Sequence, residues 1–219
     1  MKHLLTEQVI RQLLKKDGSL KSLSVPAGSI VTPLAQDFLK AKGISLDFTQ
    51  EEKLNTKPEE LTHLYGNQLT KKDNPVIIFR GKLDSLCAMI LEAQLLGEEN
   101  KNPAFVNDMQ EVLDFTRSIM PAEYRGEPMG DLRVLGYSSD ELREISHNTE
   151  KHYGRSYLLM KPSMGPLCLR LNLLRTAARE AELAAVTAFE KREDIVKALN
   201  RLSSLFYILI FKYLPSDHE

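Results

Sequence analysis

Apolar positions in the C-terminal half of the chain recur with the period of an α-helix. Over residues 166–190 they alternate in steps of four and three, which predicts one apolar stripe on a helix packed against other helices. The stripe consists of Leu167, Leu171, Leu174, Ala178, Ala181, Ala185 and Ala188. Residues 82–97, 103–119 and 193–213 show helical spacing too, and Ser138 or Ser139 begins a short helix that ends near Ile145. We predict an all-α fold, a five-helix up-and-down bundle.

The first 73 residues have a different pattern. Residues 4–16 predict a short amphipathic helix. Thr32 as N-cap and Pro33 as the first helical residue predict a helix over 33–42 that ends at Gly43, with a strand-like segment after it. The polar segment 48–75 predicts a linker with a weak helix or turn, and residues 121–130 predict a loop. We therefore expect a small N-terminal appendage and linker over residues 1–73 and the bundle domain over 74–219.

Composition excludes several classes of function. The chain has 219 residues, of which 42% are hydrophobic, enough for a substantial core. Its net charge of −1 provides no cationic surplus for nucleic acid or for an anionic membrane. The longest apolar run, Leu205 to Phe211, is shorter than the roughly 20 residues of a membrane-spanning helix. We expect a soluble, cytoplasmic protein without nucleic-acid or membrane partners, and buried, reduced thiols at Cys87 and Cys168.

A polar row runs beside the apolar stripe, one residue further round the same helix. It consists of Asn172, Arg175, Arg179 and Glu182. A charged group at the margin of a packed interface is unfavourable unless something pairs with it. One interpretation is an internal ion-pair ladder, in which the arginines pair with Glu182 or with a carboxylate on a neighbouring helix. The other is a clamp for a polyphosphate, because a guanidinium binds phosphate oxygens two at a time.

Helical spacing does not decide between an ion-pair ladder and a polyphosphate clamp, but longer sequence motifs favour the clamp. The runs RTAAREAE (175–182) and LNRLS (199–203) together resemble the C-terminal core of the ATP:cob(I)alamin adenosyltransferases of the propanediol-utilisation type. IIFRGKLDSLCA (77–88) is similar to a helix start of that family, with Asp84 at its aspartate. Three further runs resemble the ethanolamine-utilisation branch of these enzymes. They are VPAGSIVTPLAQDFLKAKGI (25–44), DELREISHN (140–148) and KPSMGPLCLRLNLLRT (161–176). The resemblance runs from about residue 20 to residue 212.

The resemblance implies transfer of the 5′-deoxyadenosyl group of ATP to the cobalt of reduced cobalamin, with release of triphosphate. Because the Co(I) centre is the nucleophile, the protein places the reactants and stabilises charge, assisted by Mg²⁺. It implies that Arg179 and Glu182 organise the phosphates and their metal, and that Asn200 binds ATP. It also implies that Arg175 pairs with Asp84 of a neighbouring subunit. The protein would then be a homo-oligomer, either a trimer or a dimer, with its sites at the subunit interfaces.

The corrinoid and the phosphates each require a further element. An apolar wall must exclude water and the lower axial ligand from cobalt, for which Tyr153, Tyr157, Leu158 and Leu159 are candidates, although they could equally pack on the bundle. The family's TKxGDxGxT phosphate loop is missing. Gly28, Ser29 and Thr32 could supply donors at a helix start instead, or form a plain helix entrance. Glu180 and Leu183 stand where the family has arginines.

Two other readings of the sequence concern metals and partners. The ethanolamine branch often has a His and Cys metal cluster where this chain has only His63, so we expect no Fe or Zn site. The chain also contains two Glu-x-x-His strings, Glu60 to His63 and Glu144 to His147. Together with Glu92 and Glu182 they could form a dimetal site in a helical bundle, or their histidines could lie at the surface.

The non-enzymatic alternative is an all-helical interaction module of a bacterial enzyme assembly, which TPLAQDFLKAKGISL favours. As an enzyme, the protein would serve ethanolamine catabolism. It could work with a reductase and an ethanolamine lyase, possible partners within a bacterial microcompartment.

Overall fold

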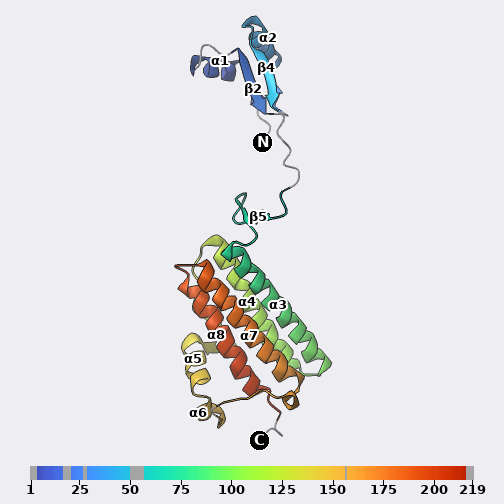
Figure 1. Cartoon of the computed structure of the whole chain (residues 1–219), viewed down its shortest axis with the longest axis vertical. Coiled ribbons are helices and arrows are strands. Elements are labelled where there is room, and N and C mark those ends of the chain that lie inside the picture. Colours follow the sequence, from blue (N-terminus) through green and yellow to red (C-terminus); the bar gives the residue numbers. More distant parts are fainter. Residues whose placement is uncertain (1–3, 17–20, 27–28, 50–56, 156, 216–219) are drawn as a thin grey trace. The chain divides into compact units, whose positions relative to one another are not determined.

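The computed structural model describes residues 4–16, 21–26, 29–49, 57–155 and 157–215 (Figure 1). The chain divides into two compact units, Met1–Glu59 and Glu60–Glu219. This division comes before the expected boundary near residue 73, because the hairpin of β5 (Leu61–His63) and β6 (Leu69–Lys71) is joined to the bundle. Among the described residues, no helix has the length and the apolar character that crossing a bilayer requires.

The first unit combines two helices with short parallel strand pairs. Helix α1 spans Glu7–Lys16, so the helix predicted over residues 4–16 begins three residues later, because Leu4–Leu5 form a strand. Helix α2 spans Pro33–Ala41, which agrees with the prediction to within one residue. Strand β1 (Leu4–Leu5) pairs with β3 (Ile30–Val31), and β2 (Ser22–Pro26) pairs with β4 (Ser45–Thr49). Thr32 is the N-cap of α2, and its hydroxyl accepts a hydrogen bond from the Ala35 backbone N–H at 3.4 Å. The small core of this unit contains Leu5, Ile10, Val25, Ala35 and Leu39.

The second unit is a helical bundle. Its long helices are α3 (Pro75–Glu99), α4 (Pro103–Arg125), α7 (Gly165–Ala188) and α8 (Glu193–Lys212), which lie side by side in Figure 1. Helix α7 packs against both α3 and α8, and the short α5 (Ser139–His147) packs on α8. The all-α class is confirmed. The count of five helices is not, because the described part of this unit also contains α6 (Thr149–Tyr153) and a 3₁₀ turn over Pro162–Met164.

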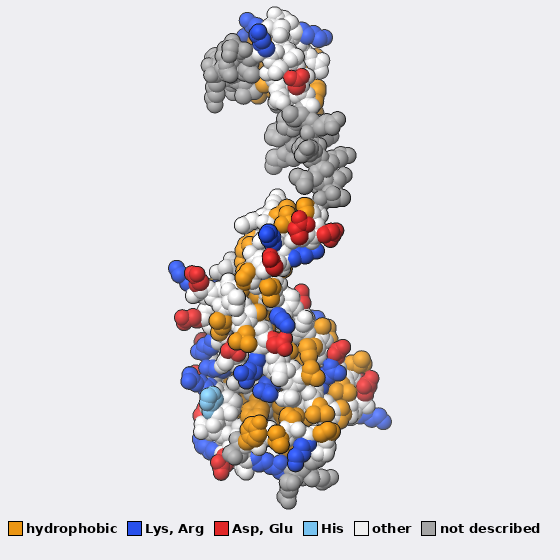
Figure 2. Space-filling view, viewed as in Figure 1, with side chains coloured by type: hydrophobic (Ala, Val, Ile, Leu, Met, Phe, Trp, Pro, Cys, Tyr) orange, Lys and Arg blue, Asp and Glu red, His pale blue; other side chains and the backbone are white. Residues whose placement is uncertain are grey.

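The predicted stripe on α7 forms the centre of the bundle. Five of its members are completely buried, namely Leu171, Leu174, Ala178, Ala181 and Ala185. The end members Leu167 and Ala188 are partly buried. Other leucines of α7 and α3 lie outside this core and are exposed to solvent. Figure 2 shows hydrophobic side chains gathered over the part of the bundle where these helices lie; Leu91, Leu95, Leu173 and Leu183 are exposed.

The predicted loop over residues 121–130 is wrong in its first half. Helix α4 continues through Pro121 to Arg125 and ends at Gly126, whose φ of +68° suits a left-handed cap. A proline inside a helix removes one hydrogen bond and costs about 3 kcal/mol. The turn persists because Ile119 and Glu123, on either side of the proline, are buried against the rest of the unit.

A second hairpin leads into α5. Strands β7 (Arg133–Val134) and β8 (Tyr137–Ser138) pair antiparallel around Leu135 and Gly136, which have φ values of +54° and +80°. Positive φ at both central residues is the signature of a tight hairpin turn that follows the natural twist of the strands. The hairpin delivers Ser138 to the start of α5. There it forms a capping box with Glu141, which fixes where this helix begins.

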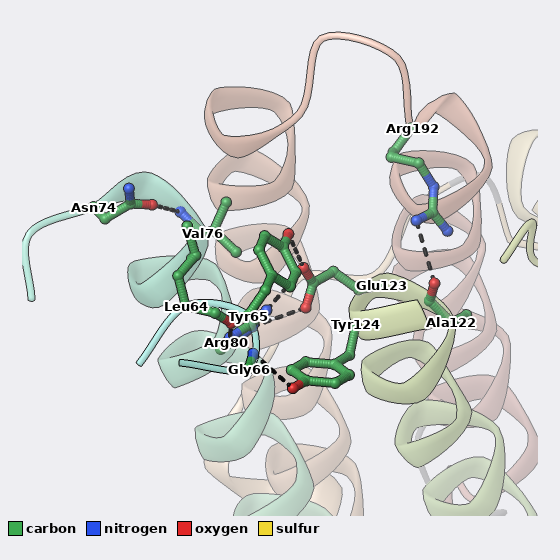
Figure 3. Close-up of polar contacts among 10 residues, drawn as sticks. All are labelled: Leu64, Tyr65, Gly66, Asn74, Val76, Arg80, Ala122, Glu123, Tyr124 and Arg192. Atoms are coloured by element: carbon green, nitrogen blue, oxygen red, sulfur yellow. Dashed lines mark hydrogen bonds and ion pairs between the residues drawn. The ribbon is translucent and has the colours of Figure 1, made fainter. Parts of the chain in front are cut away.

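The β5–β6 hairpin is fastened to the bundle by a buried carboxylate (Figure 3). Glu123 is only 3% exposed. The Arg80 guanidinium donates to both of its oxygens, from Nε at 2.8 Å and from Nη2 at 3.1 Å. The Tyr65 hydroxyl donates to Glu123 Oε1 at 2.7 Å. The ion pair joins α3 to α4, and Tyr65 connects part of the segment predicted as a polar linker to this pair.

Backbone contacts complete the attachment of the hairpin. Arg80 Nη1 donates to the Leu64 carbonyl at 2.7 Å, and the Gly66 N–H donates to the Tyr124 hydroxyl at 3.0 Å. The guanidinium also lies 5.0 Å from the centre of the Tyr65 ring, within the range of a cation–π contact. Burial and the neighbouring Glu123 carboxylate together raise the pKa of Tyr65, so its hydroxyl stays a donor.

Glu123→Ala should destabilise the bundle strongly, because it leaves the Arg80 charge partly buried and without its partner. We expect the free energy of unfolding in urea to fall by about 3 kcal/mol. Glu99→Ala, an exposed substitution on α3, serves as the control and should change it by less than about 0.5 kcal/mol. Equal effects of the two substitutions would show that the ion pair does not hold the hairpin.

Candidate functional site

Two clefts lie beside α7 and α8 and meet at His147 of α5. The first, of about 720 Å³, we call the charged cleft; it is lined by Arg143, His147, Glu182, Val186, Phe189, Glu190, Glu193, Val196, Lys197, Asn200 and Arg201. The second, of about 470 Å³, we call the tyrosine cleft; it is lined by Ser146, His147, Tyr157, Leu158, Leu159, Met160, Asn172, Arg175, Ser203, Ser204 and Tyr207. His147 lines both, so the two clefts are neighbours on the bundle.

Helical spacing explains why these side chains meet. Residues three and four apart lie on one face of a helix. On α7 this face carries the predicted polar row, with Arg175 in the tyrosine cleft and Glu182 in the charged cleft. On α8 the residues in such steps are Glu193, Lys197, Asn200, Ser204 and Tyr207. On α5 they are Ser139, Arg143 and His147.

A chain of hydrogen bonds crosses the charged cleft. Asn200 Nδ2 donates to Glu182 Oε1 at 2.9 Å, and Arg201 Nη1 donates to Asn200 Oδ1 at 2.5 Å. Arg201 Nε donates to the backbone carbonyl of Ser139 at 2.9 Å. Both ends of the Asn200 amide are thereby used, which fixes its orientation. The chain links α7, α8 and the first turn of α5.

Arg201 is the buried member of this chain, only 8% exposed. Burial lowers the pKa of its guanidinium and the nearby Arg143 charge lowers it further, whereas the Asp140 and Glu182 carboxylates oppose this shift in part. Within the described part of the chain, no carboxylate oxygen lies within 4.0 Å of a charged nitrogen of Arg201, Arg143 or Lys197. The charged cleft therefore presents three cationic side chains that the described protein does not neutralise by direct ion pairs.

The arginines of the predicted row are also without carboxylate partners among the described residues. Arg175 donates from Nε at 3.1 Å and from Nη2 at 3.0 Å to a single amide oxygen, Asn172 Oδ1. Arg179 is exposed and makes no hydrogen bond or ion pair with any described residue. Glu180 pairs instead with Lys82 of α3 at 2.7 Å. The interpretation of the row as an internal ion-pair ladder is therefore wrong.

Other predicted site residues are not brought to the clefts. Asp84 is exposed on α3 and has no partner among the described residues, and the structure gives no contact between it and Arg175. Arg179 follows Arg175 by one turn but lines neither cleft. Ser29 and Thr32 belong to the first unit, where Thr32 caps α2. Gly28 lies outside the described residues.

Three of the four candidates for an apolar wall line the tyrosine cleft. Tyr157 is 74% exposed and Leu159 is 64% exposed, whereas Leu158 is buried. Tyr153 does not line it, because its ring stacks on Phe211 with 4.5 Å between the ring centres. A large aromatic and an aliphatic side chain left exposed next to a cleft are typical of a surface that another molecule covers.

Three carboxylates of the considered dimetal site, Glu92, Glu144 and Glu182, have other partners. Glu144 accepts from Lys151 at 2.8 Å and interacts with His152 at 2.6 Å. Glu92 pairs with Arg170 at 2.6 Å. Among the described residues, no three or more His, Cys, Asp or Glu side chains come together closely enough to hold a metal ion.

Two lining residues were missed in the sequence, and two were noted without this role. Arg143 and Lys197 lie on helices whose charged residues point in several directions, so nothing in the pattern singles them out. From the sequence, His147 is interpreted as a metal ligand or a surface histidine within the DELREISHN run, and Arg201 as part of the LNRLS run. A spacing of four between Arg143 and His147 was the available signal, but it shows a shared face without showing what that face meets.

Arg201→Met should loosen the start of α5, because it removes the donors for Ser139 and Asn200 while preserving volume. We expect a loss of about 2 kcal/mol in the free energy of unfolding and faster hydrogen exchange of the α5 amides. Ser203→Ala, a nearby substitution on the same helix, should leave α5 exchange unchanged. Unchanged exchange in both variants would show that Arg201 does not anchor α5.

Comparisons with known proteins agree on one family. Residues 53–213 match the family model described as Cobalamin adenosyltransferase. Corrinoid adenosyltransferase EutT of Escherichia coli strain K12 is 28% identical to this chain over 228 residues, which cover 86% of this chain and 84% of that protein. The protein of the same name from Salmonella typhimurium strain LT2 is 34% identical over 160 residues, which cover 70% of this chain and 58% of that protein.

Proposed function

The chain belongs to the cobalamin adenosyltransferase family, and we propose that the two clefts beside α7 and α8 hold the two substrates of its reaction. The enzyme transfers the 5′-deoxyadenosyl group of ATP to the cobalt of a reduced corrinoid and releases triphosphate. In our proposal ATP occupies the charged cleft and the corrinoid occupies the tyrosine cleft. The adenosyl carbon is then transferred near His147, where the clefts meet.

The observation that carries this assignment is the set of cations without carboxylate partners. Arg143, Lys197 and Arg201 line the charged cleft, and no described carboxylate lies within 4.0 Å of their charged nitrogens. Glu182, Glu190 and Glu193 line the same cleft, but none of them forms a direct ion pair with these cations. Cations without a direct ion pair can bind an anion, and a triphosphate supplies several charged oxygens. The volume of about 720 Å³ lies in the range of clefts that bind small molecules.

The chemistry requires placement and charge stabilisation from the protein. Co(I) attacks C5′ of ATP, the C5′–O5′ bond breaks, and its electron pair stays on O5′ of the departing triphosphate. No proton is transferred, so no general base is needed. Preorganised donors near O5′ lower the barrier. Arg179 follows Arg175 by one turn and precedes Glu182, and we assign it to the leaving phosphate as ATP binds along α7.

Mg²⁺ would enter with ATP. It commonly binds through one or two carboxylates together with phosphate oxygens and waters, so it does not require a preformed cage. Glu182 lines the charged cleft and is the carboxylate that Asn200 orients, so it suits this role. The ion would neutralise phosphate charge. One N–H of the Asn200 amide donates to Glu182 and its oxygen accepts from Arg201. The second N–H is therefore left to donate to the nucleotide.

The corrinoid side depends on water exclusion. Tyr157 and Leu159 are largely exposed beside the tyrosine cleft, where they could cover one face of a planar macrocycle. A dry apolar wall keeps water and the lower ligand away from cobalt.

We further propose a homo-oligomer in which Arg175 pairs with Asp84 of a neighbouring subunit. Support comes from the lack of a carboxylate partner for Arg175 among the described residues. Asp84 is likewise exposed and has no partner there. The exposed leucines of α3 and α7 would become buried in such an assembly (Figure 2).

The resemblance to the ethanolamine-utilisation branch supports a role in ethanolamine catabolism. There, in the cytoplasm, a reductase would supply Co(I) and a lyase would use the product. The non-enzymatic interaction module is set aside, because the family is one of enzymes.

Arg179→Ala should lower the rate of adenosylcobalamin formation by roughly 100-fold or more, because it removes a charge from the leaving triphosphate. The measurement is an anaerobic spectral assay with cob(I)alamin and MgATP. Since the Arg179 side chain is exposed and makes no hydrogen bond or ion pair with any described residue, the thermal midpoint should stay near that of the wild type. Arg117→Ala, an exposed cation of α4 outside both clefts, is the matched control. Wild-type activity in Arg179→Ala would exclude this role.

A further inference from the structure

The motifs shared with the family leave open which side chains hold the outer phosphates. Arg175 lines the tyrosine cleft, and Arg179 lines neither cleft. Arg201 lines the charged cleft, but it is buried and its Nε and Nη1 are committed to Ser139 and Asn200. The cations that line this cleft and remain available are therefore Arg143 of α5 and Lys197 of α8.

Both side chains are free to take a ligand. They are exposed, and neither makes a hydrogen bond or an ion pair with any residue that the structure describes. Lys197 lies one turn before the oriented amide of Asn200 on the same face of α8, so both can reach one ligand. A lysine and an arginine without partners in one cleft match the oxygens of a terminal phosphate chain.

The position of Arg143 is built into the fold. Helix α5 is fixed at its start by the Ser138 and Glu141 capping box and by the hydrogen bond from Arg201 to Ser139. The side chain of Leu142 is completely buried, which anchors the middle of the helix. Arg143 follows Ser139 by one turn and thus lies on the side of α5 that Arg201 contacts. The charges of Arg143 and Arg201 are therefore held near each other. Asp140 and Glu182 reduce this repulsion in part, and a bound anion would reduce it further.

The acidic residues of the cleft limit where that anion can lie. Glu190 and Glu193 line the charged cleft where α7 passes into α8. Phosphate oxygens would be repelled there and attracted toward Arg143. Glu182 also lines the cleft, beside Asn200, and the Mg²⁺ that we assign to it would offset its charge. The charge distribution thus gives the phosphate chain a direction, away from the turn between α7 and α8 and toward α5.

We propose that Arg143 and Lys197 bind the β- and γ-phosphates of ATP, and the same groups of the triphosphate product, so that α5 is the phosphate-binding arm of this enzyme. The inference rests on the proposed location of ATP in the charged cleft. It assigns binding residues outside the RTAAREAE and LNRLS runs. It also gives α5 a function that its length and composition alone do not suggest.

Calorimetric titration of the full-length protein with sodium tripolyphosphate tests this inference. Arg143→Gln and Lys197→Gln should each raise the Kd for tripolyphosphate roughly tenfold, with a larger loss in the double variant. The Kd for AMP, which lacks both outer phosphates, should not change. Arg143→Lys should retain more affinity than Arg143→Gln, which separates the loss of charge from any loss of fold. Arg117→Ala is the control for removing a surface cation.

The outcomes separate this inference from the proposed function. If the wild type binds tripolyphosphate and forms adenosylcobalamin, while both Gln variants bind tripolyphosphate as tightly as Arg117→Ala, the inference is overturned and the proposed function stands. If the wild type binds neither ATP nor tripolyphosphate, both fail together. Equal losses for AMP and tripolyphosphate would also overturn the inference, because they would place the two cations elsewhere than at the outer phosphates.

Discussion

The buried guanidinium of Arg201 is the interaction on which the site depends. It holds the start of α5 through Ser139 and fixes the amide of Asn200, which in turn holds Glu182. One cation thus joins three helices, although no carboxylate oxygen of the described residues lies within 4.0 Å of its charged nitrogens. Burying a charge in this way is unfavourable unless its surroundings compensate. The hydrogen bonds of Arg201 compensate for part of the cost of burying its charge. The remaining positive potential faces the cleft, where it can attract an anionic substrate.

This arrangement suits a reaction whose nucleophile belongs to a substrate. The protein has no proton to move, so the residues at the site orient, neutralise and exclude water. The charged cleft offers cations and a fixed amide, whereas the tyrosine cleft offers exposed apolar side chains. His147 lines both clefts, so in our proposal the two substrates are neighbours. The same helices therefore separate a polar substrate from a large macrocycle while keeping the reacting atoms adjacent.

The sequence predicts those features of the fold and the site that depend on the residue spacing within a single helix. The stripe on α7 and the row beside it follow from helical spacing, and Glu182 and Asn200 do lie at one cleft. The continuation of α4 through Pro121 and the β5–β6 hairpin could not be predicted, because both depend on contacts of Glu123 with distant residues. Arg143 and Lys197 were missed for a similar reason, since a pattern shows which residues share a face but not which faces meet.

The central claim is that the triphosphate of ATP neutralises the cations of the charged cleft. A crystal structure of the full-length protein with MgATP, without corrinoid, tests it most directly. The account predicts phosphate oxygens within hydrogen-bond distance of cations that line this cleft, with the hydrogen bonds from Arg201 to Ser139 and Asn200 intact. A nucleotide bound outside the charged cleft, with those cations paired to carboxylates of the protein, would contradict it.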